Sequence, residues 1–133
     1  MGAEMCIRDR VCVAQAAVSD LVAADAAALS DGGDAVRRWV GSPVEDQATP
    51  WNALNPIVMT PQCPVMLAHA EEDEDVPIAM SRACAEAYTA RGSTADFVPL
   101  PGDHYTIIDP THEGWRSIQE GVLGWLMSGK SVG

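Results

Sequence analysis

Basic residues are scarce in this sequence. Lys and Arg number 8 against 19 Asp and Glu, which gives a formal net charge of −11 over 133 residues. Such a charge repels the phosphate backbone of nucleic acids and the surface of anionic membranes, and no basic cluster offsets the repulsion. We therefore expect no nucleic-acid partner.

Long apolar runs are absent as well. No stretch approaches the ~20 apolar residues of a membrane-spanning helix, and the N-terminus lacks the basic-then-apolar order of a secretory signal. The four cysteines form no C-x-x-C pair, and no His lies at metal-ligand spacing from them. We expect no membrane contact, no metal site and a cytoplasmic location, with Cys12, Cys63 and Cys84 as small buried residues in a reducing compartment.

The first ten residues look foreign to the rest of the chain. Residues 5–10 read MCIRDR, which is the translation of ATGTGTATAAGAGACAG, the transposon mosaic end used in preparing sequencing libraries. The stretch carries no helix cap, strand pattern or turn chemistry. We therefore divide the chain into a non-native segment, residues 1–10, and one domain, residues 11–133, whose native upstream part has been lost.

The whole chain has an ordinary globular composition, 47% hydrophobic and 20% charged. Apolar or β-prone runs predict strands over 11–18, 63–70 and 95–102. Helical spacing, Pro77 and the glycines predict helices over 34–40, 77–92 and 111–127. In the proline-rich connection between the first two strands, Trp51 and Leu54 are expected to anchor a helical turn. Because helices separate the later strands, we predict an α/β fold with a parallel sheet.

Two polar clusters follow strands of this sheet. HAEEDEDVP (69–77) follows the second strand and PGDHYTII (101–108) follows the third, so the two clusters meet at the carboxyl edge where reactive groups gather in open α/β sheets. Asp73 and His104 are 31 residues apart, in the acid-then-histidine order that ends a Ser…Asp…His triad. Asp75 is the second candidate for the acid, whereas the three glutamates of the run are expected to be exposed.

These two clusters resemble the C-terminal portion of an α/β-hydrolase of the esterase/lipase, kynurenine-formamidase-like or prolyl-oligopeptidase-like branch. That group has a pattern like H-G-x-x-D-x-x-V-P, which this sequence matches at His69, Asp73, Val76 and Pro77 and leaves at Ala70, where the family has Gly. The resemblance covers roughly residues 11–126. It implies that Asp73 is the triad acid and His104 the triad histidine of a serine hydrolase that cleaves carboxylic esters or related amides and needs no cofactor.

The nucleophile of such an enzyme is missing here. An α/β-hydrolase serine lies in a G-x-S-x-G turn, and neither this motif nor an oxyanion loop of the His-Gly-Gly type occurs in the sequence. Both elements precede the acid in chain order, so loss of the upstream part would remove them together. We expect the parent protein to be a hydrolase and the 133-residue chain to be inactive.

Other interpretations of the same residues remain open. The acid run could be a solvated face of a small non-catalytic interaction module, whereas a calcium loop fails at Val76 and Pro77. A peptidase of the prolyl-oligopeptidase type would share the acid and the histidine. His69 is expected to satisfy backbone groups of the turn, and His112 to lie at the surface in the first turn of the last helix. Trp39 and Trp51 are interpreted as core anchors, with pocket lining as the alternative. The sequence does not fix the oligomeric state.

Overall fold

Three parallel strands form the sheet, in the order β1-β2-β3. The computed structural model describes residues 11–30, 32–41 and 50–128, so the segment interpreted as non-native, residues 1–10, lies outside the described residues. The strands are β1 (Cys12–Gln15), β2 (Val65–Ala70) and β3 (Ala95–Leu100). Cys12 is level with Val65, and Val65 with Ala95, so the carboxyl ends of β2 and β3 lie at the same edge. The predicted parallel α/β sheet is confirmed.

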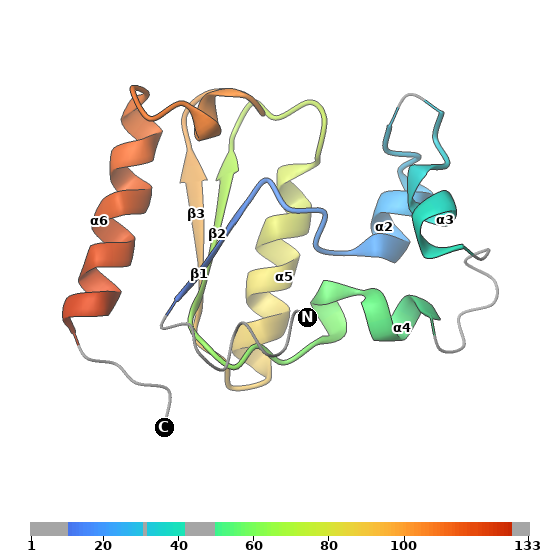
Figure 1. Cartoon of the computed structure of the whole chain (residues 1–133), viewed down its shortest axis with the longest axis horizontal. Helices are drawn as coiled ribbons and strands as arrows, with labels where there is room; N and C mark the ends of the chain where they lie inside the picture. Colours follow the sequence, from blue (N-terminus) through green and yellow to red (C-terminus); the bar gives the residue numbers. More distant parts are fainter. Residues whose placement is uncertain (1–10, 31, 42–49, 129–133) are drawn as a thin grey trace.

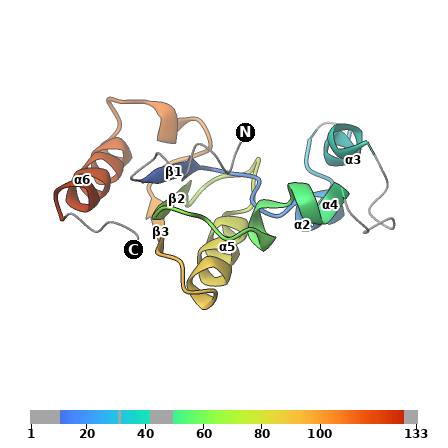
Figure 2. The same ribbon diagram turned by 60° about the horizontal axis from the view of Figure 1, so that its bottom comes forward.

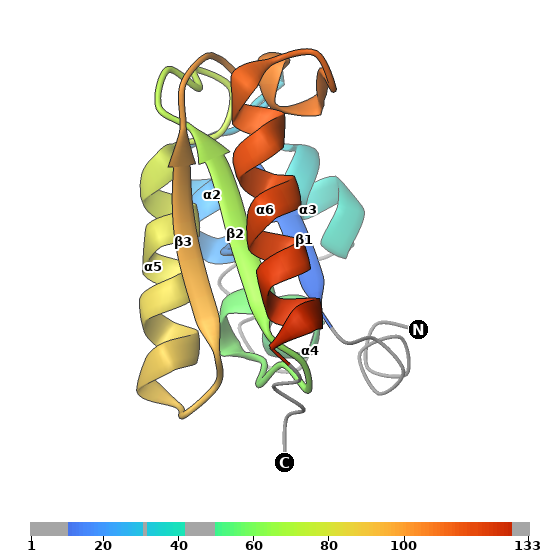
Figure 3. The same ribbon diagram turned by 90° about the vertical axis from the view of Figure 1, so that its left-hand side faces the viewer.

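Helices cover both faces of the sheet. Helix α5 (Ile78–Ala90) packs on one face and α6 (Glu113–Met127) on the other (Figure 1, Figure 3). The central strand β2 is buried along its whole length. Its Met66 packs with the α6 layer and its Leu67 with the α5 layer, and this explains why the strand is a continuous apolar run rather than an alternating one.

The long connection between β1 and β2 folds into short helices that the sequence only partly predicted. Its elements are α2 (Leu21–Ala26), α3 (Ala35–Val40), α4 (Pro50–Leu54) and the 3₁₀ turn η2 (Pro56–Val58). Helices α2, α3 and α4 lie together to one side of the sheet (Figure 2). Helix α2 was not predicted. It forms because the Asp20 carboxylate accepts the N–H groups of Val22 and Ala23, which caps its N-terminus.

Several local predictions need correction. Strand β1 is shorter than residues 11–18 because Ala16 has a positive φ of 45°, which ends the extended run. Trp51 is a core anchor, 1% exposed, but Trp39 is 67% exposed and anchors nothing. Leu54, expected to be an anchor, is exposed as well. Asp34, which its position before the apolar run predicts as the N-cap of α3, forms no capping bond with its side chain.

No helix in the described ranges is long and apolar enough to cross a membrane.

Candidate active site

The loops after β2 and β3 meet at the carboxyl edge of the sheet. The strand ladder continues beyond the strands themselves: Glu71 N–H donates to the Leu100 carbonyl at 2.8 Å, and Glu72 N–H donates to the Gly102 carbonyl at 3.0 Å. At the end of β1, the Gln15 side-chain amide donates to the Ile107 carbonyl at 2.9 Å. The loop after β3 is thus attached to both other strands, which fixes its position next to the acid run.

Asp73 and His104 form a hydrogen-bonded pair in this arrangement. The distance between His104 Nδ1 and Asp73 Oδ2 is 2.8 Å, and the Asp73 side chain is 0% exposed while that of His104 is 30% exposed. Asp73 Oδ1 accepts the N–H groups of Asp75 at 2.9 Å and Val76 at 2.8 Å. Of the two aspartates weighed from the sequence, Asp73 is therefore the one bound to the histidine. Asp75 is exposed, as are the three glutamates.

The electrostatics of the pair favour an ionised carboxylate. Burial alone raises the pKa of the Asp73 carboxyl, but the N–H of Val76, the ring of His104 and the N–H of Asp75 donate to it and together lower its pKa below the ordinary value. An ionised carboxylate is only an acceptor, so His104 must carry its proton on Nδ1. No residue that the structure describes forms a hydrogen bond to His104 Nε2, which leaves this nitrogen for a proton transfer.

A second imidazole reaches the same carboxylate from inside the protein. His69 is 0% exposed, its Nε2 lies 2.9 Å from the Val76 carbonyl and 3.2 Å from Asp73 Oδ2, and its Nδ1 lies 2.7 Å from Ser81 Oγ. His69 thus binds a backbone group of the turn, as predicted. Ser81, His69 and Asp73 repeat the order of contacts in a serine triad. However, Ser81 is also 0% exposed, so no substrate could reach its hydroxyl.

The histidine loop is shaped by Gly102 and Asp103, which belong to the PGDHYTII cluster but whose roles in the turn were not predicted. Asp103 Oδ1 accepts the N–H groups of Tyr105 and Thr106, both at 3.0 Å, which turns the chain directly after His104. Gly102 has a φ of +102°, and a Cβ atom there would collide with the side chain of Thr106. An Asp and a Gly before a histidine are the available sequence signal for this turn. His112 begins α6, where its Nδ1 accepts the Gly114 N–H, and it is half-buried rather than a surface residue.

No serine in residues 11–30, 32–41 and 50–128 forms a hydrogen bond to His104. Ser19 and Ser81 are buried. Ser30 has a strained backbone, with φ 92°, but it follows a helix, whereas the nucleophile turn of an α/β-hydrolase follows a strand. Ser42 and Ser131 lie outside the described residues. Asp73 and His104 are therefore paired here without a hydrogen bond to any serine of the described ranges.

Asp73, Asp75 and His104 are also the residues that could jointly approach a metal ion. Each places one ligand atom within 4.8 Å of the others. A cation among them would compete for the His104 nitrogen and the Asp73 oxygen that already bind each other. The same groups thus serve either the hydrogen-bonded pair or a cation.

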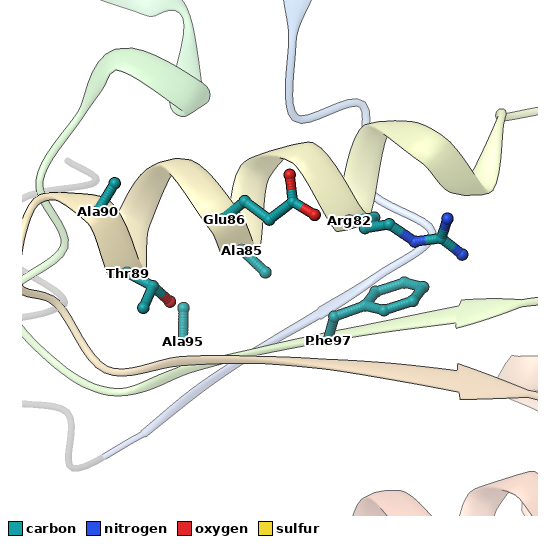
Figure 4. A pocket seen from close by; sticks show the side chains of 7 residues that line it. All are labelled: Arg82, Ala85, Glu86, Thr89, Ala90, Ala95 and Phe97. Atoms are coloured by element: carbon teal, nitrogen blue, oxygen red, sulfur yellow. The ribbon is translucent and has the colours of Figure 1, made fainter.

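A shallow groove lies away from this edge, between α5 and β3 (Figure 4). The Arg82 guanidinium lies 5.3 Å from the centre of the Phe97 ring and partly covers it. The groove is lined by Arg82, Ala85, Glu86, Thr89, Ala90, Ala95 and Phe97. Neither Asp73 nor His104 belongs to it, so the groove is separate from the candidate active site.

The parallel sheet with helices on both faces is part of an α/β-hydrolase fold. Solved structures of that fold match the chain. An acylaminoacyl peptidase of Pyrococcus horikoshii matches 89% of this chain with a TM-score of 0.68 and 16% sequence identity. The esterase Est2 of Thermogutta terrifontis matches 92% of it with a TM-score of 0.64 and 18% identity. A truncated carbohydrate esterase from gut microbiota matches 87%, with a TM-score of 0.65 and 18% identity.

The chain spans only part of these structures: 20% of the peptidase, 43% of Est2 and 42% of the carbohydrate esterase. No family model and no curated protein matches the sequence. At these identities the comparisons define the fold.

Proposed function

We propose that this chain carries the acid and the histidine of a serine hydrolase, Asp73 and His104, and that the nucleophile and the oxyanion hole lie in residues upstream of Val11 in the parent protein. The observation that carries this proposal is the 2.8 Å bond between Asp73 and His104 at the carboxyl edge of the sheet. The matches to esterases and to a peptidase of the same fold support it.

The reaction follows from the free Nε2 of His104. As a serine Oγ attacks the substrate carbonyl, Nε2 takes the hydroxyl proton, and the resulting imidazolium is stabilised by the ionised Asp73. When the carbon–oxygen bond of the ester breaks, the leaving alcohol takes that proton and the acyl group stays on the serine. A water molecule then gives its proton to Nε2 and attacks the acyl group, which leaves as the acid while the proton returns to the serine.

The substrate class is a small-molecule carboxylic ester or a related amide. Nothing in this cycle requires a cofactor, because every proton is held by His104, the serine or the product. We also propose a reducing, cytoplasmic location, which fits the buried Cys84 thiol that forms no disulfide.

The non-native origin of residues 1–10 belongs to the same proposal. If MCIRDR derives from a sequencing adapter, native sequence replaces it in the source genome. The experiment is to amplify and sequence the source DNA from codons 60–70 back through the codon of Arg10. The expected result is that MCIRDR disappears and that a strand, a G-x-S-x-G turn and an oxyanion loop precede Val11. A confirmed MCIRDR would contradict the proposal and leave the interaction module as the better interpretation.

Activity is the second part of the test. The recovered full-length protein should hydrolyse p-nitrophenyl esters, and His104→Ala or replacement of the recovered serine should lower kcat by a factor of about 10⁴ or more. The 133-residue chain should not turn over these esters. Turnover by the purified 133-residue chain that is abolished by His104→Ala would contradict the statement that its nucleophile lies upstream.

A peptidase is the second candidate, and the similarity to an acylaminoacyl peptidase favours it. The acid and the histidine do not separate ester from peptide substrates. Parallel assays of the full-length protein with p-nitrophenyl esters and with N-acylated amino-acid p-nitroanilides separate them. A kcat/KM that is higher for the anilides would support the peptidase.

A further inference from the structure

His69 is a completely buried imidazole with both nitrogens bonded. Its Nε2 faces the Val76 carbonyl at 2.9 Å and the Asp73 carboxylate at 3.2 Å, and both groups are acceptors only. Nε2 must therefore carry the proton. Nδ1 is then an acceptor, and it accepts a hydrogen bond from the Ser81 hydroxyl at 2.7 Å. The tautomer of His69 is fixed by its surroundings.

Four groups surround the carboxylate of Asp73. Oδ1 accepts two backbone N–H groups, from Asp75 and Val76. Oδ2 accepts His104 Nδ1–H at 2.8 Å and lies 3.2 Å from His69 Nε2. A carboxylate offers about four lone-pair directions, so this set leaves the group no free rotation. The His104 side chain is 30% exposed, whereas that of His69 is completely buried.

If His69 donated only to the Val76 carbonyl, its role would be purely structural. However, Nε2 also lies 3.2 Å from Asp73 Oδ2, the oxygen that binds His104. His69 and His104 share no direct bond, yet one oxygen atom connects them. An effect of His69 on His104 would therefore have to pass through Asp73.

We propose that His69 is a positioning residue that acts as a second imidazole donor to Asp73 and keeps Oδ2 aligned with His104, while Ser81 holds the His69 ring through Nδ1. The inference rests on the proposed function to the extent that Asp73 serves there as the triad acid. Its consequence is that Asp73 stays ionised and in place when His104 moves or changes charge.

The test is NMR of the imidazole groups in the 133-residue chain, so it needs neither the nucleophile nor a substrate. Long-range proton–nitrogen spectra should show His104 protonated on Nδ1 and His69 on Nε2. The His104 Nδ1–H proton should resonate far downfield and exchange slowly. In His69→Phe, which keeps a buried ring but removes the donor, this proton should shift upfield. Its exchange should accelerate about tenfold, the order expected for one lost hydrogen bond to a charged group. His69→Gln, which can restore a donor near Nε2, should recover most of the signal.

Tyr88→Phe is the matched control for general destabilisation. It removes a partly buried hydrogen bond, from the Tyr88 hydroxyl to the Pro56 carbonyl at 2.8 Å, at a position outside the site. This variant should lose stability but leave the His104 signal unchanged. If His69→Phe leaves the His104 proton as in the unsubstituted chain, or if Tyr88→Phe moves it equally, the proposal is wrong.

Ser81→Ala covers the case in which His69→Phe does not fold. It leaves the His69 donor in place but removes the hydrogen-bond partner of Nδ1, so the ring is held less firmly. We expect a broadened, faster-exchanging His104 signal. An unchanged His104 signal in Ser81→Ala would overturn the proposal as well. Failure of the proposed function would appear separately. The full-length protein would then not hydrolyse esters, while the His104 signal would still respond to the substitutions of His69 and Ser81.

Discussion

Asp73→Asn and Asp75→Asn provide a matched test of the site, because both remove one negative charge and they lie two residues apart. The Asp73 side chain is 0% exposed. Its Oδ1 accepts two backbone N–H groups, its Oδ2 binds His104, and His69 Nε2 lies 3.2 Å from Oδ2. Asp75 is exposed. We expect a large loss of stability from the first substitution and almost none from the second.

The magnitude follows from the contacts of Asp73. An asparagine has one carbonyl oxygen, which can keep the N–H groups of Asp75 and Val76. Its NH₂ group then faces the imidazole N–H groups of His69 and His104. His104 can change its tautomer and become an acceptor, but His69 is held as a donor by the Val76 carbonyl. Hydrogen bonds to charged groups contribute ~1.5–3 kcal/mol each, so the loss should be about 3 kcal/mol. The loss for Asp75→Asn should stay within ~0.5 kcal/mol.

Urea unfolding, followed by circular dichroism, measures both variants. The pKa of Asp73 is lowered in the folded state, so its contribution is present above the ordinary value of 3.8 and is lost as the pH falls through the folded value. The stability difference between the unsubstituted chain and Asp73→Asn should therefore be full at pH 7 and shrink as the pH falls below 3.8. Equal losses for the two variants, or a difference that grows in acid, would refute the reasoning.

Two further predictions concern the loops and the core. Gly102→Ala should cost about 1–3 kcal/mol in a thermal melt, because it adds a collision with Thr106 to a positive φ, whereas Gly41→Ala, with a φ of +81° and open space around its Cβ, should cost only ~1–2 kcal/mol. A smaller loss at Gly102 than at Gly41 would contradict the packing argument. Burial raises the pKa of the Cys84 thiol, so iodoacetamide at pH 8 should modify half-buried Cys12 well before Cys84, as read by peptide mass spectrometry. The two cysteines should be modified at equal rates only after unfolding in urea. Equal rates of modification in the folded chain would contradict the burial of Cys84.

Local patterns in the sequence were sufficient to predict the main strands and helices. The continuous apolar run of residues 63–70 predicts a strand covered on both faces, and β2 is that strand. Pro77 and Gly92 mark the two ends of a helix, and α5 begins and ends between them. An acid and a histidine after consecutive parallel strands must reach the same edge. These features depend on residues close together in the chain, where periodicity and backbone preference decide.

Only the tertiary structure decided which groups bind one another. Sequence left Asp73 and Asp75 as alternatives, and the turn that bonds Asp73 Oδ1 to two backbone N–H groups aims its other oxygen at His104, 31 residues away. The contact of His69 with Ser81 and that of Gln15 with Ile107 span 12 and 92 residues. Such contacts leave no periodic signal in the chain, because they depend on how loops meet after the sheet has formed. The sequence thus determined which strands carry the acid and the histidine, and packing determined the hydrogen bonds that hold them together.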